Sequence, residues 1–185
     1  MIFKKHFELE GKHAVLGASK YYWLNYNPEK IEDYYRSIMA KERGTELHAF
    51  AAQCIKLGQK LPRSRKTLNQ YVNDAIGFKM SPEVVLYYSD NCFGTADAIS
   101  FRDKFLRIHD FKSGSIIADM RQLKIYAALF CLEYRVNPFD IKIELRIYQN
   151  DDVDIHEADH SEIKQIMEHI IECDRLIENI KRREG

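Results

Sequence analysis

The feature that most constrains the fold is a change in the spacing of hydrophobic residues near residue 80. Before this point the pattern is helical, and Ser19 and Thr45 have the side chains of helix N-caps. The expected helices cover residues 20–24, 29–40, 45–55 and 67–78. Gly44 separates the second of these helices from the third. The first 80 residues therefore predict a mainly helical part.

After residue 80, apolar and polar residues alternate, which is typical of β-strands. Strands are expected at 83–88, 92–101, 105–112 and 140–149. Helical spacing returns at 118–135 and in an amphipathic helix at 161–183, whereas the acidic stretch 151–160 is expected to be a solvated loop that caps this last helix. This order predicts an α/β fold with a sheet of about four strands.

Length and composition favour one soluble domain over residues 1–185. The expected subdivision is a helical part at 1–80, a sheet core at 81–150 and a terminal helix at 159–183. No apolar stretch approaches the roughly 20 residues of a membrane span, and the N-terminus does not resemble a secretory signal. The four cysteines contain no C-x-x-C pair. Isolated thiols of this kind favour a cytoplasmic location.

The charge balance by itself disfavours a protein that binds nucleic acid through its overall charge. There are 28 basic and 28 acidic residues, so the formal net charge is zero. Residues 1–80, however, carry 14 basic and 8 acidic side chains, and residues 81–185 carry 14 basic and 20 acidic. Such a division suits a polyanion on the first part and a cation on the second, but chance scatter of surface charge explains it equally well.

The residues that carry chemistry lie on two neighbouring strands. A tight hairpin between them places Asp97 across from Asp110, and Asp110 and Lys112 share a face because they are two residues apart. Two close carboxylates need a proton or a cation between them. Oxygen ligands suit Mg²⁺ or Mn²⁺, and a lysine beside such an ion can position or activate a water. The set indicates metal-assisted hydrolysis of a phosphodiester.

Two helices add candidates to this set. Gln122 and Tyr126 are four residues apart and lie on one helical face, just after Lys112. His48 offers a neutral imidazole as a further metal ligand. Glu46 is an alternative ligand from the same helix, but the two side chains face different ways.

In this order the motifs resemble those of the PD-(D/E)XK nuclease superfamily, and of its RecB-like branch with phage-type exonucleases. They are Gly44-x-x-x-His48, Gly94-x-x-Asp97, Asp110-x-Lys112 and Gln122-x-x-x-Tyr126. The resemblance covers about residues 44–130. It implies a restriction-endonuclease-like core, with a mixed sheet of about four strands flanked by helices.

The resemblance also implies a role for each matching position. His48, Asp97, Asp110 and the backbone carbonyl of Phe111 would hold Mg²⁺ or Mn²⁺. Lys112 would activate water or stabilise the transition state, and Gln122 and Tyr126 would orient Lys112 and the DNA backbone. The element Gly17-Ala18-Ser19-x-x-x-Trp23-Leu24 also resembles, loosely, an N-terminal element of phage-encoded members. The expected contacts with DNA are Ser19, Lys20, Arg63, Arg65 and Lys66.

The expected function is therefore a metal-dependent deoxyribonuclease, either an exonuclease or one that processes ends and single strands. It would act in phage or bacterial recombination, repair or replication, in the bacterial host cytosol. An iron–sulfur cluster, found in several relatives, is not expected because no cysteine precedes His48 and only Cys173 lies near the C-terminus. The expected partner is DNA, and no contact with a membrane is expected. Association with further copies of the chain or with a recombination protein is left open. The alternatives are an inactive nuclease-like module that binds DNA or protein, and a restriction-type endonuclease.

Overall fold

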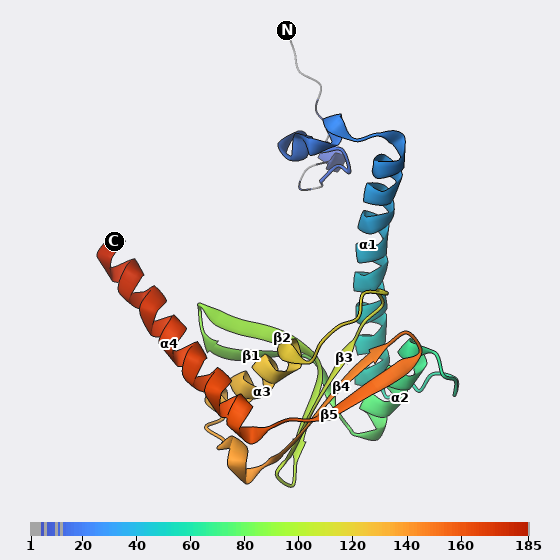
Figure 1. Cartoon of the computed structure of the whole chain (residues 1–185). Helices are drawn as coiled ribbons and strands as arrows, with labels where there is room; N and C mark the ends of the chain where they lie inside the picture. Colours follow the sequence, from blue (N-terminus) through green and yellow to red (C-terminus); the bar gives the residue numbers. More distant parts are fainter. Residues whose placement is uncertain (1–4, 6, 10, 12, 185) are drawn as a thin grey trace. The chain divides into compact units, whose positions relative to one another are not determined.

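The computed structural model describes residues 5, 7–9, 11 and 13–184 (Figure 1). The chain forms two compact units, Met1–Thr45 and Glu46–Gly185, and we describe each by itself. The sequence predicts one domain over residues 1–185, and the boundary between the two units lies within its expected helical part, residues 1–80. Among the described residues, no helix has both the length and the hydropathy that a bilayer span requires.

The first unit contains short 3-10 helices and the beginning of a long α-helix. The 3-10 helices are η1 (Phe7–Leu9) and η2 (Ala18–Asn25), and the long helix is α1 (Pro28–Leu57). The sequence predicts η2 as an ordinary helix after Ser19, but the backbone departs from helical geometry at Lys20. The indole N–H of Trp23 closes this segment by donating to the carbonyl of Gly17 at 3.1 Å.

The predicted break at Gly44 is wrong, because α1 continues through it without interruption. Thr45, expected as an N-cap, instead donates its hydroxyl to the Lys41 carbonyl at 3.1 Å inside the helix. A glycine in a helix costs about 1 kcal/mol relative to alanine. The helix-forming residues on both sides of Gly44 offset that cost, and α1 ends in the second unit.

The second unit is built on a five-stranded mixed sheet, which confirms the predicted α/β class and helices flanking a sheet. The strands are β1 (Ser81–Ser89), β2 (Cys92–Arg102), β3 (Phe105–Phe111), β4 (Lys142–Gln149) and β5 (Asp152–Glu157). They lie in the order β1-β2-β3-β4-β5. All neighbours are antiparallel except β3 and β4, which are parallel. The connection between these two strands contains α3 (Arg121–Glu133) and the short η3 (Pro138–Asp140).

The fifth strand was not expected from the sequence. β5 lies in the acidic stretch predicted as a loop, and it pairs with β4 at the edge of the sheet. Most of its side chains are exposed, so the acidic residues remain solvated. The predicted capping is confirmed: Asp159 Oδ1 accepts hydrogen bonds from the backbone N–H groups of Ser161 and Glu162, at 2.7 and 3.0 Å. The capped helix is α4 (His160–Glu184).

Hydrophobic cores cover both faces of the sheet. Ile147 and Tyr148 are neighbours on β4 and therefore point to opposite faces. Ile147 belongs to the core formed with α3 and α4, whereas Tyr148 belongs to the core formed with α2 (Thr67–Gly77) and the end of α1. The four cysteines are free thiols, and Cys54 and Cys131 are buried within these cores.

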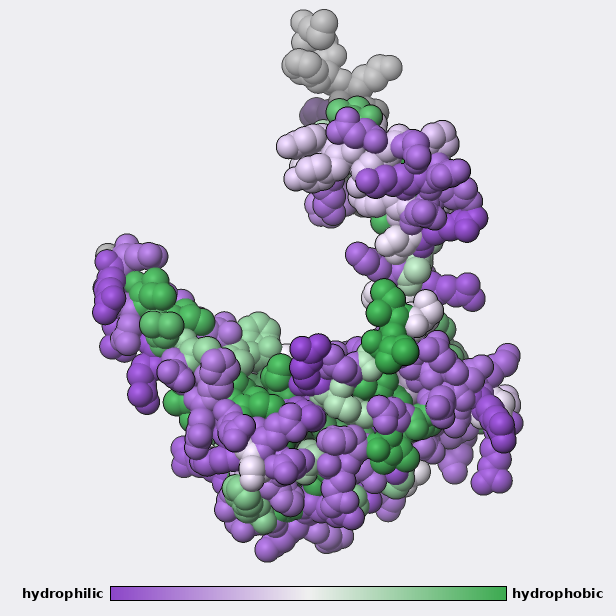
Figure 2. All heavy atoms as spheres, viewed as in Figure 1, coloured by the Kyte–Doolittle hydropathy of each residue, from purple (hydrophilic) through white to green (hydrophobic). Residues whose placement is uncertain are grey.

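Some hydrophobic side chains stay outside these cores. Figure 2 shows them gathered along α4, where Leu176, Ile177 and Ile180 are exposed. The α3 and α4 helices also enclose a largely apolar groove of about 590 Å³, bordered by Ile125, Ile166 and other side chains.

Candidate functional site

The register of the first three strands brings three carboxylates into one row. The pairs Pro82–Ala98 and Val84–Ala96 place Glu83 across from Asp97 on the neighbouring strand. The pair Ala98–His109 makes Asp97 and Asp110 the next positions along β2 and β3. The predicted opposition of Asp97 and Asp110 follows from this register, and Glu83 extends the row to β1.

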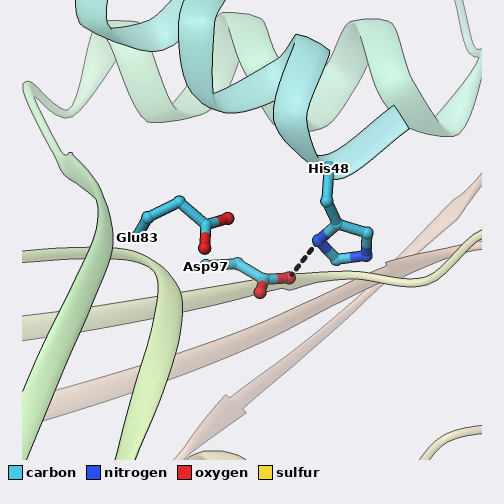
Figure 3. A group of neighbouring side chains, drawn as sticks. All are labelled: His48, Glu83 and Asp97. Carbon is cyan, nitrogen blue, oxygen red and sulfur yellow. Dashed lines mark ion pairs between the residues drawn. The ribbon is translucent and has the colours of Figure 1, made fainter. Parts of the chain in front are cut away.

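His48 reaches this row from α1. Its Nδ1 lies 3.3 Å from Asp97 Oδ2, and Figure 3 shows the imidazole and Glu83 approaching Asp97 from either side. One potential ligand atom from each of His48, Glu83 and Asp97 lies within 4.8 Å of the others. The hydrogen bond to Asp97 raises the pKa of His48 above its usual value, although burial opposes the shift. These side chains form the candidate metal centre.

Glu83 was missed in the sequence. A regular hairpin closed by Asp90–Asn91 would pair Val84 with Asp97, and only the register shift between Tyr87 and Ser89 brings Glu83 across from Asp97. Glu83 has a φ of 53°, which is uncommon for a residue other than glycine. Burial, and then the Asp97 charge, raise the pKa of its carboxyl. Glu46, the alternative ligand on α1, is exposed and does not belong to the centre.

Asp97 is fixed by the backbone of the next strand. Its Oδ2 accepts a hydrogen bond from the backbone N–H of Phe111 at 2.9 Å. The Phe111 ring is buried, with its centre 5.1 Å from that of His48 and 5.6 Å from that of Tyr71. Phe111 therefore helps to position Asp97 through its N–H and His48 through its ring. The role of its backbone carbonyl as a metal ligand stays a prediction.

Buried Asp110 and half-buried Lys112 form an ion pair next to the metal centre. Only 2% of Asp110 is exposed. Lys112 Nζ lies 2.9 Å from its Oδ2 and donates a hydrogen bond to its Oδ1 at 3.1 Å. Burial, together with the charge of Asp97, raises the pKa of Asp110 to about 6. Asp110 lies outside the group of three potential ligands, and its role as a metal ligand stays a prediction.

A chain of contacts from α3 holds Lys112 in place. Gln122 Oε1 accepts a hydrogen bond from Lys112 Nζ at 3.1 Å, and Gln122 Nε2 donates to the Tyr126 hydroxyl at 2.9 Å. The Tyr126 ring lies against Gly94, where an added Cβ would be only 2.8 Å from Cε1 of the ring. The glycine of the Gly94-x-x-Asp97 motif is thus required by the close approach of Tyr126.

The structure brings together the predicted site residues His48, Asp97, Asp110, Lys112, Gln122 and Tyr126. The predicted DNA contacts are not part of this cluster. Arg63, Arg65 and Lys66 are exposed in the segment between α1 and α2, and Ser19 and Lys20 are exposed on η2 in the first unit. Their role in binding DNA stays a prediction.

The donor set suits a hard divalent cation. Three carboxylates converge here, and the cationic groups that the structure describes beside them are Lys112, His48 and, near Glu83, Lys56. Burial, and then repulsion by Asp97, raise the pKa of Glu83 and of Asp110, and a bound cation would stabilise both carboxylates in their charged form. Carboxylate oxygens and one imidazole fit Mg²⁺ or Mn²⁺ better than a soft metal, which prefers thiolates.

A family model described as a protein of unknown function, DUF2800, matches residues 83–176. The match covers just over half of the chain, and the protein belongs to the DUF2800 family. The matched segment contains Glu83, Asp97, Asp110, Lys112 and the α3 residues, whereas His48 lies before it. No curated protein and no solved structure matches the chain.

Proposed function

We propose that this protein is a metal-dependent deoxyribonuclease that hydrolyses phosphodiester bonds. The observation that carries the proposal is the ion pair of Asp110 with Lys112 beside the centre of His48, Glu83 and Asp97. A domain that only binds DNA has no chemical need for a half-buried lysine among acids. The order of the motifs supports a restriction-endonuclease-like core, and an exonuclease or end-processing enzyme of DNA recombination, repair or replication in the bacterial cytosol.

The residues that would hold Mg²⁺ or Mn²⁺ are His48, Glu83 and Asp97, with Asp110 at their edge. When bound, the metal would lower the pKa of a water and withdraw charge from a phosphate oxygen. Asp97 is already oriented for this purpose by the Phe111 N–H, so little side-chain order must be gained on binding.

Lys112 has the position of the group that handles the attacking water. Its ammonium lies 2.9 Å from Asp110 and 3.1 Å from Gln122, and its side chain is about one-third exposed. A lysine fixed in this way can orient a water or stabilise the negative charge that develops on the phosphate. Gln122 and Tyr126 act as positioning residues because they hold Lys112.

The test is cleavage of end-labelled DNA with Mg²⁺ or Mn²⁺. We expect Asp110→Asn and Lys112→Gln to lower the cleavage rate at least about 100-fold. The matched controls Asp103→Asn and Lys104→Gln lie at the other end of the same hairpin and should keep the wild-type rate. Equal rates in all variants would contradict the proposal, and salt-dependent binding without any cleavage would identify the inactive module instead.

Metal binding is measured separately from activity. We expect Mn²⁺ to raise the melting temperature of the wild-type protein above its value in chelator, because a ligand that binds only the folded state stabilises it. The same addition should raise it much less in Asp97→Asn and in His48→Ala. Glu46→Gln is the control on α1 and should respond as the wild type does.

A further inference from the structure

The loop between Lys112 and Gln122 exposes two isoleucines, and Ile117 borders a hollow that is also lined by Ile147, the β4 partner of Asp110. The hydrogen bond between Lys112 and Gln122 closes this loop at its base. Ile116 is 89% and Ile117 is 86% exposed, more than any other large hydrophobic side chain in the described chain. Two adjacent and almost fully exposed isoleucines form a contiguous apolar patch, which is the kind of surface that marks a binding site.

The backbone of this loop is held in place although its side chains are free. The Gln149 side chain on β4 donates hydrogen bonds to the carbonyls of Gly114 and Ile116, at 2.6 and 2.7 Å. It also accepts one from the N–H of Ala118 at 3.0 Å. One amide therefore satisfies three backbone groups around the tip. The isoleucines project from an ordered support, so contact with a partner costs little conformational entropy.

A small hollow of about 170 Å³ lies beside Ile117, and its lining is chemically mixed. Ile147 and Ala118 contribute apolar surface, and Asp152 and Asp154 contribute carboxylates. Carboxylates repel phosphate groups but accept hydrogen bonds from the amino groups of bases. The charge on this side of the tip therefore favours a base over the sugar–phosphate backbone.

We propose that Ile116 and Ile117 form an apolar wedge that unstacks the terminal base of a duplex whose scissile phosphate lies at Lys112. Apolar side chains inserted at a base step partly unstack it, and a base gains by packing on an apolar surface. The proposal rests on the proposed nuclease function and names its substrate, which is a duplex end opened by the protein. The wedge separates the bases, while His48, Asp97 and Lys112 act on the phosphate.

The first experiment compares two substrates of the same sequence, a blunt duplex and the single strand. The double variant Ile116→Ser/Ile117→Ser should cut the single strand at the wild-type rate. It should cut the duplex at least about tenfold more slowly than the wild type does. Leu176→Ser, which removes a 60% exposed leucine from α4, is the matched control and should leave both rates unchanged. An unchanged ratio of duplex to single-strand cleavage in the double variant would overturn the wedge.

The second experiment needs no cleavage and separates the two proposals. A duplex with 2-aminopurine at its end is bound to Asp110→Asn, and unstacking of the probe raises its fluorescence. We expect this rise in fluorescence to be lost when Ile116→Ser and Ile117→Ser are combined with Asp110→Asn. A wild-type protein that cuts neither DNA contradicts the nuclease. Fluorescence that does not rise, or rises equally with both isoleucines replaced, contradicts the wedge.

Discussion

At the scale of single residues, Gly94 controls the position of Lys112 without touching it. A methyl group at this position would be 2.8 Å from the Tyr126 ring, so the ring must move and its hydrogen bond with Gln122 must lengthen or break. We expect Gly94→Ala to cost about 1–3 kcal/mol of stability and to lower DNA cleavage about tenfold. The cost should be much smaller in a Tyr126→Ala background, because the side chain that clashes is then absent. Equal costs in the two backgrounds, measured by denaturant unfolding, would contradict this explanation.

Asp110 predicts how stability depends on pH. Its pKa of about 6 in the folded protein is higher than the usual 3.8, so the folded state binds this proton more tightly than the unfolded state does. Its contribution to the free energy of unfolding is therefore largest below about pH 4 and is lost as the pH rises through 6.

We expect metal-free Asp110→Asn to gain about 2–3 kcal/mol relative to the wild type between pH 4 and pH 7.5. Denaturant unfolding in chelator at several pH values measures this difference. Asp103→Asn, at an exposed turn, should show no such trend. A difference between Asp110→Asn and the wild type that does not vary with pH would show that burial does not raise this pKa.

The candidate site illustrates what a sequence reveals at this scale. Asp97, Asp110 and Lys112 were predictable because a hairpin turn and the two-residue period of a strand determine which side chains meet. Glu83 was missed because its role depends on the register between β1 and β2 and on a backbone with positive φ, and residue types do not reveal either. The contact of Gly94 with Tyr126 is a tertiary contact between a strand and a helix, so only the structure explains this glycine.

At the scale of elements, the N-terminus of α2 is capped by a distant turn. Asp151 Oδ1 accepts hydrogen bonds from the backbone N–H and the hydroxyl of Thr67, at 2.8 and 3.0 Å, and the Asp151 N–H donates to that hydroxyl at 2.7 Å. Lys66, the residue at the N-cap position, makes no such side-chain bond. Asp151, in the turn between β4 and β5, therefore acts as the N-cap of α2 and connects this helix to the sheet.

We expect Asp151→Gly to destabilise the protein by about 0.5–2 kcal/mol, the usual cost of losing a cap. Glycine is chosen because Asp151 has a φ of 59°, where other residues are strained. Asn150→Gly, at a φ of 52° in the same turn, is the control and should cost less. Thermal unfolding compares the two. A larger loss in the control would show that the turn, and not the cap, matters.

The elements that the sequence predicts correctly are those with strong periodicity. β4 alternates isoleucine and leucine with polar residues, and α4 repeats its apolar residues at helical spacing, so both were found almost to their ends. β5 was missed because an edge strand has no need of an apolar face, and its acidic residues are typical of loops. The predicted break at Gly44 is wrong because the low helix propensity of one glycine is a small cost, and the helix-forming residues on both sides of it outweigh that cost.

At the scale of the whole molecule, a net charge of zero makes any attraction to DNA local. Each phosphate that the protein neutralises adds about −0.9 to the slope of log affinity against log salt. If Arg63, Arg65 and Lys66 contact three phosphates, replacing all three by alanine should flatten that slope by about 3. Fluorescence anisotropy with the Asp110→Asn protein between 50 and 200 mM salt, typical conditions for such titrations, measures it. Replacing Arg182 and Arg183, at the end of α4, is the control and should leave the slope unchanged.

The parallel pairing of β3 with β4 has a consequence for the order of folding. The hairpins β1–β2 and β2–β3 need only short turns, whereas β4 can join the sheet only after the chain has crossed over through α3. Closing this longer connection is slower than forming a hairpin. The Lys112 N–H donates a hydrogen bond to the Tyr148 carbonyl on β4 at 2.9 Å, and His48 comes from a helix far earlier in the chain. The acidic row can therefore form early in refolding, but the lysine is locked beside it only in the last stage. Activity regained during refolding should then lag behind the recovery of β-structure.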